Sequence, residues 1–282
     1  MSKFNPIRLI KKLNKMTHMD HSERVAHWNR LSGQVKGFVS KHSRSQGPVR
    51  VLDLGCGCPY WASVTFQSWG WDVTGVDVED VRPRCSYLGM ARAMGAAFAL
   101  KRFIKDRLVF PKMYAELTKS LGANINHKAI DIRQIDGRQL PFDDGTFDLV
   151  HSQVVLEHVQ DVPALLDDVY RVMKPGGLTF QTIHLFPSFS GGHTSCWVDS
   201  LQALGDEARP WSHLRGGPSL PGLNKLRLAD YGKMFDERFE VIDWVPGKGS
   251  EDLLTPEIRA ELSDYTDDDL LTVIITVGAR KK

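Results

Sequence analysis

The chain has 282 residues, of which 42% are hydrophobic, 25% charged and 9% aromatic. This is the composition of a globular protein that can bury a sizeable core. No apolar run approaches the roughly 18–20 residues that span a bilayer, and the N-terminus lacks the features of a secretory signal. The four cysteines (Cys56, Cys58, Cys85 and Cys196) have no paired spacing. We therefore expect reduced thiols, no disulfide framework, no metal clip at Cys56 and Cys58, and a cytoplasmic location.

Charge is unevenly distributed along the chain. Residues 1–130 carry 21 Lys and Arg against 9 Asp and Glu, a net charge of +12, whereas residues 131–282 carry 15 against 25, a net charge of −10. The ordinary interpretation of this charge asymmetry is that both halves simply present charged side chains to solvent. The more specific interpretation is a basic N-terminal half that attracts an anionic acceptor or makes peripheral contact with a membrane surface. A nucleic-acid partner is not expected.

Residues 1–46 are predicted to be a helical extension. Ile7, Ile10 and Leu13 recur at helical spacing, and a second helix is expected over 22–39, before a linker at 43–48. The extension is interpreted either as a packing appendage or as a lid on a ligand site, with membrane contact as a further alternative.

From residue 47 onward, short apolar stretches alternate with helical ones, which predicts one α/β domain over 47–282. A doubly wound, mostly parallel sheet with helices on both faces gives this rhythm. The predicted strands are 50–54, 72–78, 128–132, 147–151, 178–183, 239–245 and 271–279. The predicted helices are 61–69, 113–121, 164–173, 226–235 and 256–262.

Two segments interrupt this rhythm. Residues 81–112 carry eight Lys and Arg against Asp106 alone, and their composition predicts one or two helices in an insertion. Residues 185–223 form a long stretch rich in Gly, Pro and aromatic residues. Loops of this length are usually functional or disordered, and the repeated Trp, Phe and His argue against disorder. Both segments are expected to form the acceptor side of a site.

The segment from Val49 to Trp61 predicts a strand, a glycine turn and a helix, which is how doubly wound folds seat a nucleotide-like cofactor. A dinucleotide site needs a third glycine where Tyr60 stands. Asp53-x-Gly55-x-Gly57 instead fits a ligand that has an amino-acid end and no pyrophosphate.

Two further carboxylates follow at predicted strand ends. Asp77 comes at the end of the second predicted strand, where a carboxylate can accept both hydroxyls of a ribose. Asp131, near the end of the third, could accept the exocyclic amine of adenine, with Ile132 against the ring.

These residues resemble the class I S-adenosylmethionine-dependent methyltransferases of the broad type-11 group. The matching segments are 51–57, 75–77, 129–131, 140–150, 156–158 and 172–177. The resemblance implies a Rossmann-like, seven-stranded sheet whose last strand is antiparallel, and S-adenosyl-L-methionine as the cofactor. It also implies the cofactor contacts: Asp53, Gly55, Cys56 and Gly57 at the methionine end, Asp77 and Val78 at the ribose, Asp131 and Ile132 at the adenine, and Ser152 beside the methyl group.

Methyl transfer to a hydroxyl needs alignment of the acceptor and a base that removes its proton. Histidine is the commonest base, and the candidates are His184, His158 and His193. Glu157-His158 also resembles the metal site of ubiquinone-pathway O-methyltransferases. The further carboxylate of those enzymes is replaced here by Val154, so no metal is expected.

The sequence thus predicts an enzyme that O-methylates a hydroxylated small molecule or glycan-type acceptor. Two alternatives stay open at this point. One is an N- or C-methyltransferase acting on another small molecule, and the other is a catalytically silent binding module that uses the basic half of the chain.

Overall fold

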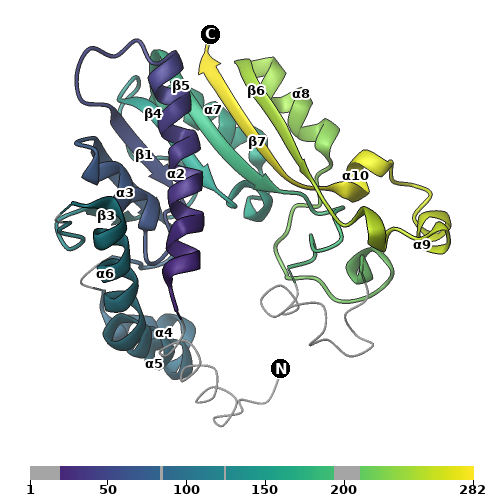
Figure 1. Ribbon diagram of the computed structural model, residues 1–282, viewed down its shortest axis with the longest axis horizontal. Coiled ribbons are helices and arrows are strands. Elements are labelled where there is room, and N and C mark those ends of the chain that lie inside the picture. Colours follow the sequence, from purple (N-terminus) through teal and green to yellow (C-terminus); the bar gives the residue numbers. More distant parts are fainter. Residues whose placement is uncertain (1–19, 83–84, 124, 194–209) are drawn as a thin grey trace. The chain divides into compact units, whose positions relative to one another are not determined.

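The computed structural model describes residues 20–82, 85–123, 125–193 and 210–282, and it divides the chain into two compact units (Figure 1). The first unit joins the chain up to Lys41 to Gly47–Arg138, and the second joins His42–Gln46 to Gln139–Lys282. Seven strands follow one another in the order β3-β2-β1-β4-β5-β7-β6. The first unit supplies β1 to β3 and the second supplies β4 to β7, and each unit is described separately below.

The strands of the first unit are parallel. They are β1 (Arg50–Leu54), β2 (Asp72–Asp77) and β3 (Asp131–Gln134). In the register, Asp53 of β1 lies opposite Gly75 of β2, and Gly75 lies opposite Ile132 of β3. The apolar side chains of β1 are buried, as expected for a parallel strand that is covered on both faces.

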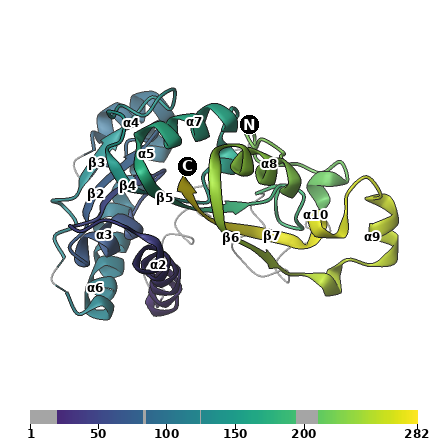
Figure 2. The ribbon, with the colours of Figure 1, turned by 90° about the horizontal axis from the view of Figure 1, so that it is seen from above.

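The helices of the first unit form around this sheet. They are α2 (Ser22–His42), α3 (Trp61–Ser68), α4 (Tyr87–Met94), α5 (Ala96–Ile104), the π-helical turn η1 (Lys105–Val109) and α6 (Phe110–Leu121). Helices α2, α3 and α6 share one core and lie together beside the strands in Figure 2. The indole rings of Trp28 and Trp61 stack in this core at 5.3 Å. The described helix of the N-terminal extension is therefore built into the core, and its role as a lid stays a prediction. The expected helix around Ile7, Ile10 and Leu13 lies outside the described residues.

The third strand begins later than the sequence predicts. The expected strand over 128–132 is wrong at its start, because the chain turns at Asn126 before it extends. The carbonyl oxygen of Asn126 accepts a hydrogen bond from the N–H of Ala129, and its side-chain oxygen accepts one from the N–H of Lys128. As a result, Asp131 is the first residue of β3, opposite Thr74, and Gln134 is the last, opposite Asp77.

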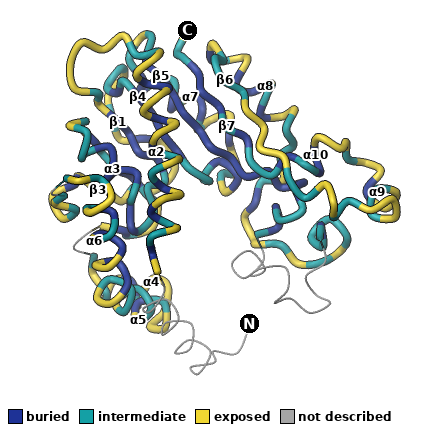
Figure 3. Tube along the Cα trace, viewed as in Figure 1, coloured by how far each residue is buried: buried dark blue, intermediate teal, exposed yellow. Residues whose placement is uncertain are grey.

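The second unit contains the longer strands. They are β4 (Phe147–Gln153), β5 (Met173–His184), β6 (Phe239–Lys248) and β7 (Thr272–Lys281). Strand β5 pairs in parallel with β4, whereas β7 runs antiparallel to both β5 and β6. Most residues of β4 and β5 are buried, whereas β6 is mainly intermediate or exposed (Figure 3). Strand β5 begins earlier than the predicted 178–183, so Gly176 and Gly177 lie inside it, at an irregularity in its register with β4.

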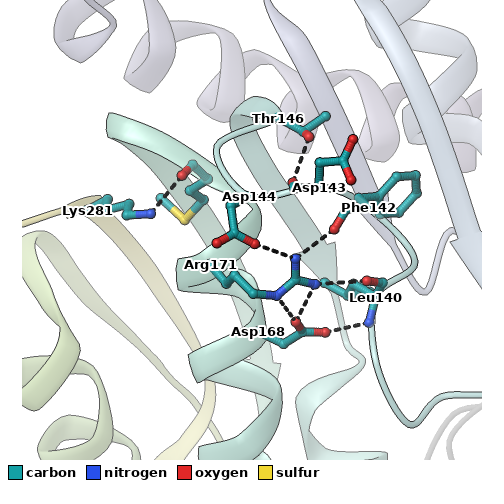
Figure 4. A network of polar contacts seen from close by, with 9 residues as sticks. Leu140, Phe142, Asp143, Asp144, Thr146, Asp168, Arg171 and Lys281 are labelled. Atoms are coloured by element: carbon teal, nitrogen blue, oxygen red, sulfur yellow. Dashed lines mark hydrogen bonds and ion pairs between the residues drawn. The ribbon is translucent and has the colours of Figure 1, made fainter.

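The helices of the second unit are η2 (Leu156–His158), α7 (Val162–Val172), η5 (Ser212–Leu214), α8 (Leu228–Arg238), η6 (Glu251–Leu253), α9 (Pro256–Glu261) and α10 (Asp267–Leu271). Arg171 at the end of α7 fixes the turn that leads into β4 (Figure 4). Its guanidinium donates to the carbonyl oxygens of Leu140 and Phe142 and pairs with the carboxylates of Asp144 and Asp168. This explains why the 140–148 motif has a defined shape.

The fold class predicted from the sequence is confirmed: a seven-stranded, mostly parallel sheet with helices and antiparallel closing strands. Among the described residues, no helix combines the length and the apolarity needed to cross a membrane.

Candidate functional site

The glycine turn after β1 has a conformation that depends on glycine. Gly55 and Gly57 have φ angles of 65° and 55°, in the left-handed region that residues with a Cβ avoid. A Cβ on Gly57 would meet no atom closer than 3.9 Å, so the backbone leaves open space beside this residue. Tyr60 follows at the N-cap of α3 and is 3% exposed, packed near the ring of Tyr114. The turn therefore has room beside the second glycine, with a buried aromatic residue where a dinucleotide motif needs the third.

Asp77, the last residue of β2, connects this strand to the glycine turn. Its Oδ2 accepts a hydrogen bond of 2.9 Å from the N–H of Gly57, and its Oδ1 accepts one of 2.8 Å from the N–H of Glu79. Each carboxylate oxygen has a further lone pair, so Asp77 can hold the loop and still accept ligand hydroxyls. Val78 follows with 59% of its side chain exposed, an apolar surface beside the carboxylate.

Asp53 is buried, unlike a residue that contacts a ligand at the surface. Its side chain is 2% exposed and accepts a hydrogen bond of 2.5 Å from the Ser63 hydroxyl on α3. This bond joins β1 to the helix across the glycine turn. Asp53 thus stabilises the turn by linking the two elements on either side of it. Its predicted contact with the methionine end of the cofactor stays a prediction.

The thiols beside the turn are protonated. Burial raises the pKa of both Cys56 and Cys58, in the case of Cys58 to about 12. The expectation that these two residues form no metal clip stays a prediction.

The structure does not place Asp131 at the ligand edge of the sheet. Because β3 begins at this residue, Asp131 lies at the opposite end of the strand from its carboxyl end, where it pairs with Arg133 at 2.7 Å. Ile132 is 7% exposed and belongs to the core that includes Val64 and Tyr60. The placement of both residues at the strand's carboxyl end is therefore corrected, and their predicted adenine contacts lose their geometric basis.

Two residues that the sequence analysis missed lie at the carboxyl end of β3. Gln134 is level with Asp77, and its Nε2 donates to the carbonyl oxygen of Val78 at 3.1 Å. Asp136 follows in an exposed turn, where its carboxylate accepts from the N–H of Arg138. The Asp136-Gly137 pair is a turn signal that marks the true end of this strand.

Ser152 lies inside the second unit. The sequence predicts strand four over 147–151 with Ser152 at its exit, but β4 continues to Gln153. Ser152 is 0% exposed, and its hydroxyl donates to the side-chain oxygen of Gln181 on β5. Its hydroxyl is buried and hydrogen-bonded to the neighbouring strand. The prediction that Ser152 lies just beyond the end of the strand is therefore wrong.

The three candidate histidines form one cluster in the second unit. His184 is the last residue of β5, as predicted, and is 1% exposed. Its Nδ1 lies 2.5 Å from Nε2 of His193, and the two rings stack at 4.7 Å. His158 in η2 is exposed, with its ring edge-on to His193 at 5.0 Å. Burial is the main cause that lowers the pKa of His184 to about 3 and of His193 to about 4, so both are neutral at pH 7.

Glu157 precedes His158 and faces the same cluster. Its side chain is 2% exposed, and burial raises the pKa of its carboxyl group to about 8. Single ligand atoms from Glu157, His184 and His193 lie within 4.8 Å of one another. The sequence signal for this grouping is weak, because the three residues are far apart along the chain.

The described parts of the 185–223 loop are packed rather than open. Trp211 is 0% exposed, and its Nε1 donates to the carbonyl oxygen of Leu270. Phe186 is 7% exposed and contacts the ring of His213. These two aromatic side chains therefore belong to the core, and the role of the loop as the acceptor side stays a prediction. Residues 194–209, including Cys196, lie outside the described part.

Residues 19–238, most of the chain, match a protein family described as "Methyltransferase domain". The chain belongs to this family, within the class I S-adenosylmethionine-dependent methyltransferases, and S-adenosylmethionine is the cofactor. The open space beside Gly57, the carboxylate of Asp77 and the exposed Val78 fit such a ligand.

Relatives with curated names match part of the chain. The uncharacterized protein YafE of Escherichia coli is 32% identical over 138 residues, which cover 47% of this chain and 63% of YafE. A demethylmenaquinone methyltransferase of Streptomyces avermitilis is 31% identical over 121 residues, covering 39% of this chain and 52% of that protein. The chain thus spans about half to two thirds of the length of these relatives. Among solved structures, the PH0226 protein of Pyrococcus horikoshii covers 90% of this chain and 91% of its own, with 16% identity and a TM-score of 0.48.

Proposed function

We propose that the chain transfers the methyl group of S-adenosylmethionine to an oxygen atom of a hydroxylated small molecule. The observation that carries the proposal is the geometry at the ends of β1 and β2. There, Gly55 and Gly57 have the left-handed conformation, and the Asp77 carboxylate accepts a hydrogen bond from the backbone N–H of Gly57. Bound S-adenosylmethionine supplies an activated methyl group on a sulfonium, and the protein's part is to bind and align.

Within this proposal, Asp77 accepts the ribose hydroxyls and Val78 covers one face of the adenosine. For the adenine amine we propose Asp136 instead of Asp131, because Asp136 follows the carboxyl end of β3 and is exposed. A direct comparison tests this choice. Asp136→Ala should weaken cofactor binding about tenfold, the value of one lost hydrogen bond to a charged group. Asp131→Ala should change it less than threefold, and the reverse order would restore the original assignment.

Oxygen as the acceptor atom is supported by the histidine cluster. A hydroxyl must lose its proton during methyl transfer, and neutral imidazoles can receive it. Among His184, His158 and His193, His158 is the exposed one. The name of the demethylmenaquinone relative supports a small-molecule acceptor and leaves the acceptor atom of this chain open. An anionic or glycan-type acceptor stays part of the proposal, since the first 130 residues have a net charge of +12.

The basic insertion supports a peripheral membrane contact as a second proposal. Several large apolar side chains are exposed on α4, α5 and η1, namely Leu88, Met94, Leu100, Phe103 and Leu108. Exposed Arg92 and Arg107 lie on the same elements. Cations next to exposed apolar groups suit the surface of an anionic membrane.

Sedimentation with vesicles tests the membrane proposal. The protein should sediment with phosphatidylserine vesicles at low salt and not with phosphatidylcholine vesicles. The double variant Phe103→Ser/Leu108→Ser should lose most of this binding. Equal sedimentation of the double variant and the wild type would contradict the proposal.

The methyl-transfer proposal is tested with methyl-labelled S-adenosylmethionine and fractionated cell extract. The wild type should label a small-molecule fraction, and the methyl linkage in the product identifies the acceptor atom. Asp77→Ala is the matched inactive variant. If the wild type binds the cofactor and labels no fraction, the chain acts as a binding module. If the label is on nitrogen or carbon, the oxygen assignment is wrong.

A further inference from the structure

Three potential metal ligands from separate segments converge in the second unit. Glu157 comes from η2, His184 from the end of β5, and His193 from the loop that follows β5. One ligand atom of each lies within 4.8 Å of the other two. Two imidazoles and one carboxylate are a donor set that binds zinc and related divalent ions.

The hydrogen bonds around His184 favour the tautomer that a metal site needs. The Ser188 hydroxyl donates to the carbonyl oxygen of Leu185 at 2.8 Å, so its lone pairs face Nε2 of His184 at 3.3 Å. The Ser190 hydroxyl lies at the same distance from Nε2. Nε2 is then the protonated nitrogen, and Nδ1 presents its lone pair to the cluster. Metal-binding histidines are commonly oriented in this way by a hydrogen bond to the other ring nitrogen.

The loop places His193 at a conformational cost. His193 has a φ angle of 50°, in a region that non-glycine residues seldom adopt, and its N–H donates to the carbonyl oxygen of Ser190. Two residues earlier, a Cβ on Gly191 would lie 2.1 Å from the carbonyl oxygen of Phe186. The loop is therefore folded tightly against itself, and this turn directs the imidazole toward His184.

Of the three side chains, Glu157 has the weakest hydrogen bonding. Among the described residues, no hydrogen bond of good geometry reaches either carboxylate oxygen, although the side chain is 2% exposed. The backbone N–H groups of Glu157 and His184 lie close enough to lower the pKa of the carboxyl group, but burial outweighs them. Buried carboxyl groups are normally hydrogen-bonded or bound to a metal. A hydrogen bond between His184 and His193 accounts for the 2.5 Å between their nitrogens, but it does not involve the Glu157 carboxyl group, which has only its backbone contacts. A cation between the three side chains satisfies all of them.

We propose that Glu157, Nδ1 of His184 and Nε2 of His193 bind one divalent metal ion of the zinc type. Zinc–nitrogen bonds of about 2.0–2.1 Å in a tetrahedral site put two imidazole nitrogens roughly 3.4 Å apart, so loading moves the two rings apart by about 1 Å. Three protein ligands leave one position for water or an acceptor oxygen.

This site goes beyond the proposed function and does not depend on it. It also differs from the Glu157-His158 arrangement considered in the sequence, because β5 and its following loop supply the two histidines. His158 stays outside the ligand set and remains available as an imidazole base.

Metal binding is measured on the full chain after dialysis against chelator, by calorimetry with zinc and by absorption with cobalt(II). The wild type should bind one zinc ion with a micromolar or lower dissociation constant. The cobalt(II) form should show the intense visible bands of tetrahedral coordination. Glu157→Gln and His193→Asn should each weaken zinc binding at least tenfold. His213→Gln is the matched control, since this histidine binds the carbonyl oxygen of Phe186 and should leave zinc affinity within threefold.

Circular dichroism reports whether each variant folds, and His193→Asn decides the question if Glu157→Gln does not fold. The proposal is overturned if the wild type binds no zinc below millimolar concentration. It is also overturned if folded His193→Asn binds zinc like the wild type, which would place the ion elsewhere. Loss of methyl transfer with intact zinc binding would contradict the proposed function and leave the metal site standing.

Discussion

Replacing Gly75 with alanine tests the packing beneath the cofactor turn. Gly75 lies in β2, between Asp53 of β1 and Ile132 of β3. A Cβ at this position would lie 2.6 Å from Cδ1 of Ile132 and 3.1 Å from the side-chain atoms Sγ of Cys56 and Oγ of Ser63. Three neighbours must shift, and overpacking of a core of this kind costs about 1–3 kcal/mol. We expect Gly75→Ala to lower the free energy of unfolding by about 2 kcal/mol.

A double-mutant cycle with Ile132→Val isolates the cause. This substitution removes Cδ1, the atom in closest contact, and alone costs about 1 kcal/mol because Ile132 is buried. If the clash dominates, the double variant is destabilised by about 1.5 kcal/mol instead of the additive value of about 3 kcal/mol. Urea denaturation monitored by tryptophan fluorescence measures all four proteins. Additive losses would refute the packing described for Gly75 and, with it, the register of β3.

Three other substitutions have defined outcomes in the same denaturation assay. Arg171→Ala should lower the free energy of unfolding by about 2–3 kcal/mol, because it removes charge-assisted hydrogen bonds that fix the turn before β4. The control Lys233→Ala, at an exposed residue, should change this free energy by less than about 0.5 kcal/mol. Equal effects of the two substitutions would contradict the role of the Arg171 network. Gly37→Ala should stabilise by about 0.5–1 kcal/mol, because this exposed helical glycine has no atom within 4 Å of an added Cβ. Gly191→Ala should destabilise by at least about 3 kcal/mol through its contact with the backbone at Phe186, and a neutral effect would show that the loop is not folded as described.

Much of the sheet is predictable because its strands are apolar and end at strong turn signals. The bounds of β1 match the prediction, since the short segment with Val51, Leu52 and Leu54 ends at Gly55. The start of β3 was not predictable from its alternating pattern. The hydrogen bonds of Asn126 decide it, and they moved Asp131 away from the ligand edge. Likewise, nothing in the residues after His151 signals that β4 continues past Ser152 to pair with β5.

The histidine cluster was predictable in part. His184 is at the end of its predicted strand, and His158 follows β4 as expected. The position of His193 depends on a tight turn after Ser190, which brings a residue nine positions downstream back to His184. The burial of the Glu157 carboxyl group is a tertiary property, because it depends on how η2 packs.

Calorimetric titration with S-adenosylmethionine tests the central claim, that the ends of β1 and β2 hold this cofactor. The wild type, Asp77→Ala and Asp72→Ala are compared, the last of these at the opposite end of β2. Loss of two hydrogen bonds to the Asp77 carboxylate should raise the dissociation constant by about 10- to 100-fold, and Asp72→Ala should change it less than threefold. Unchanged binding by folded Asp77→Ala, or no binding by the wild type, would contradict the account.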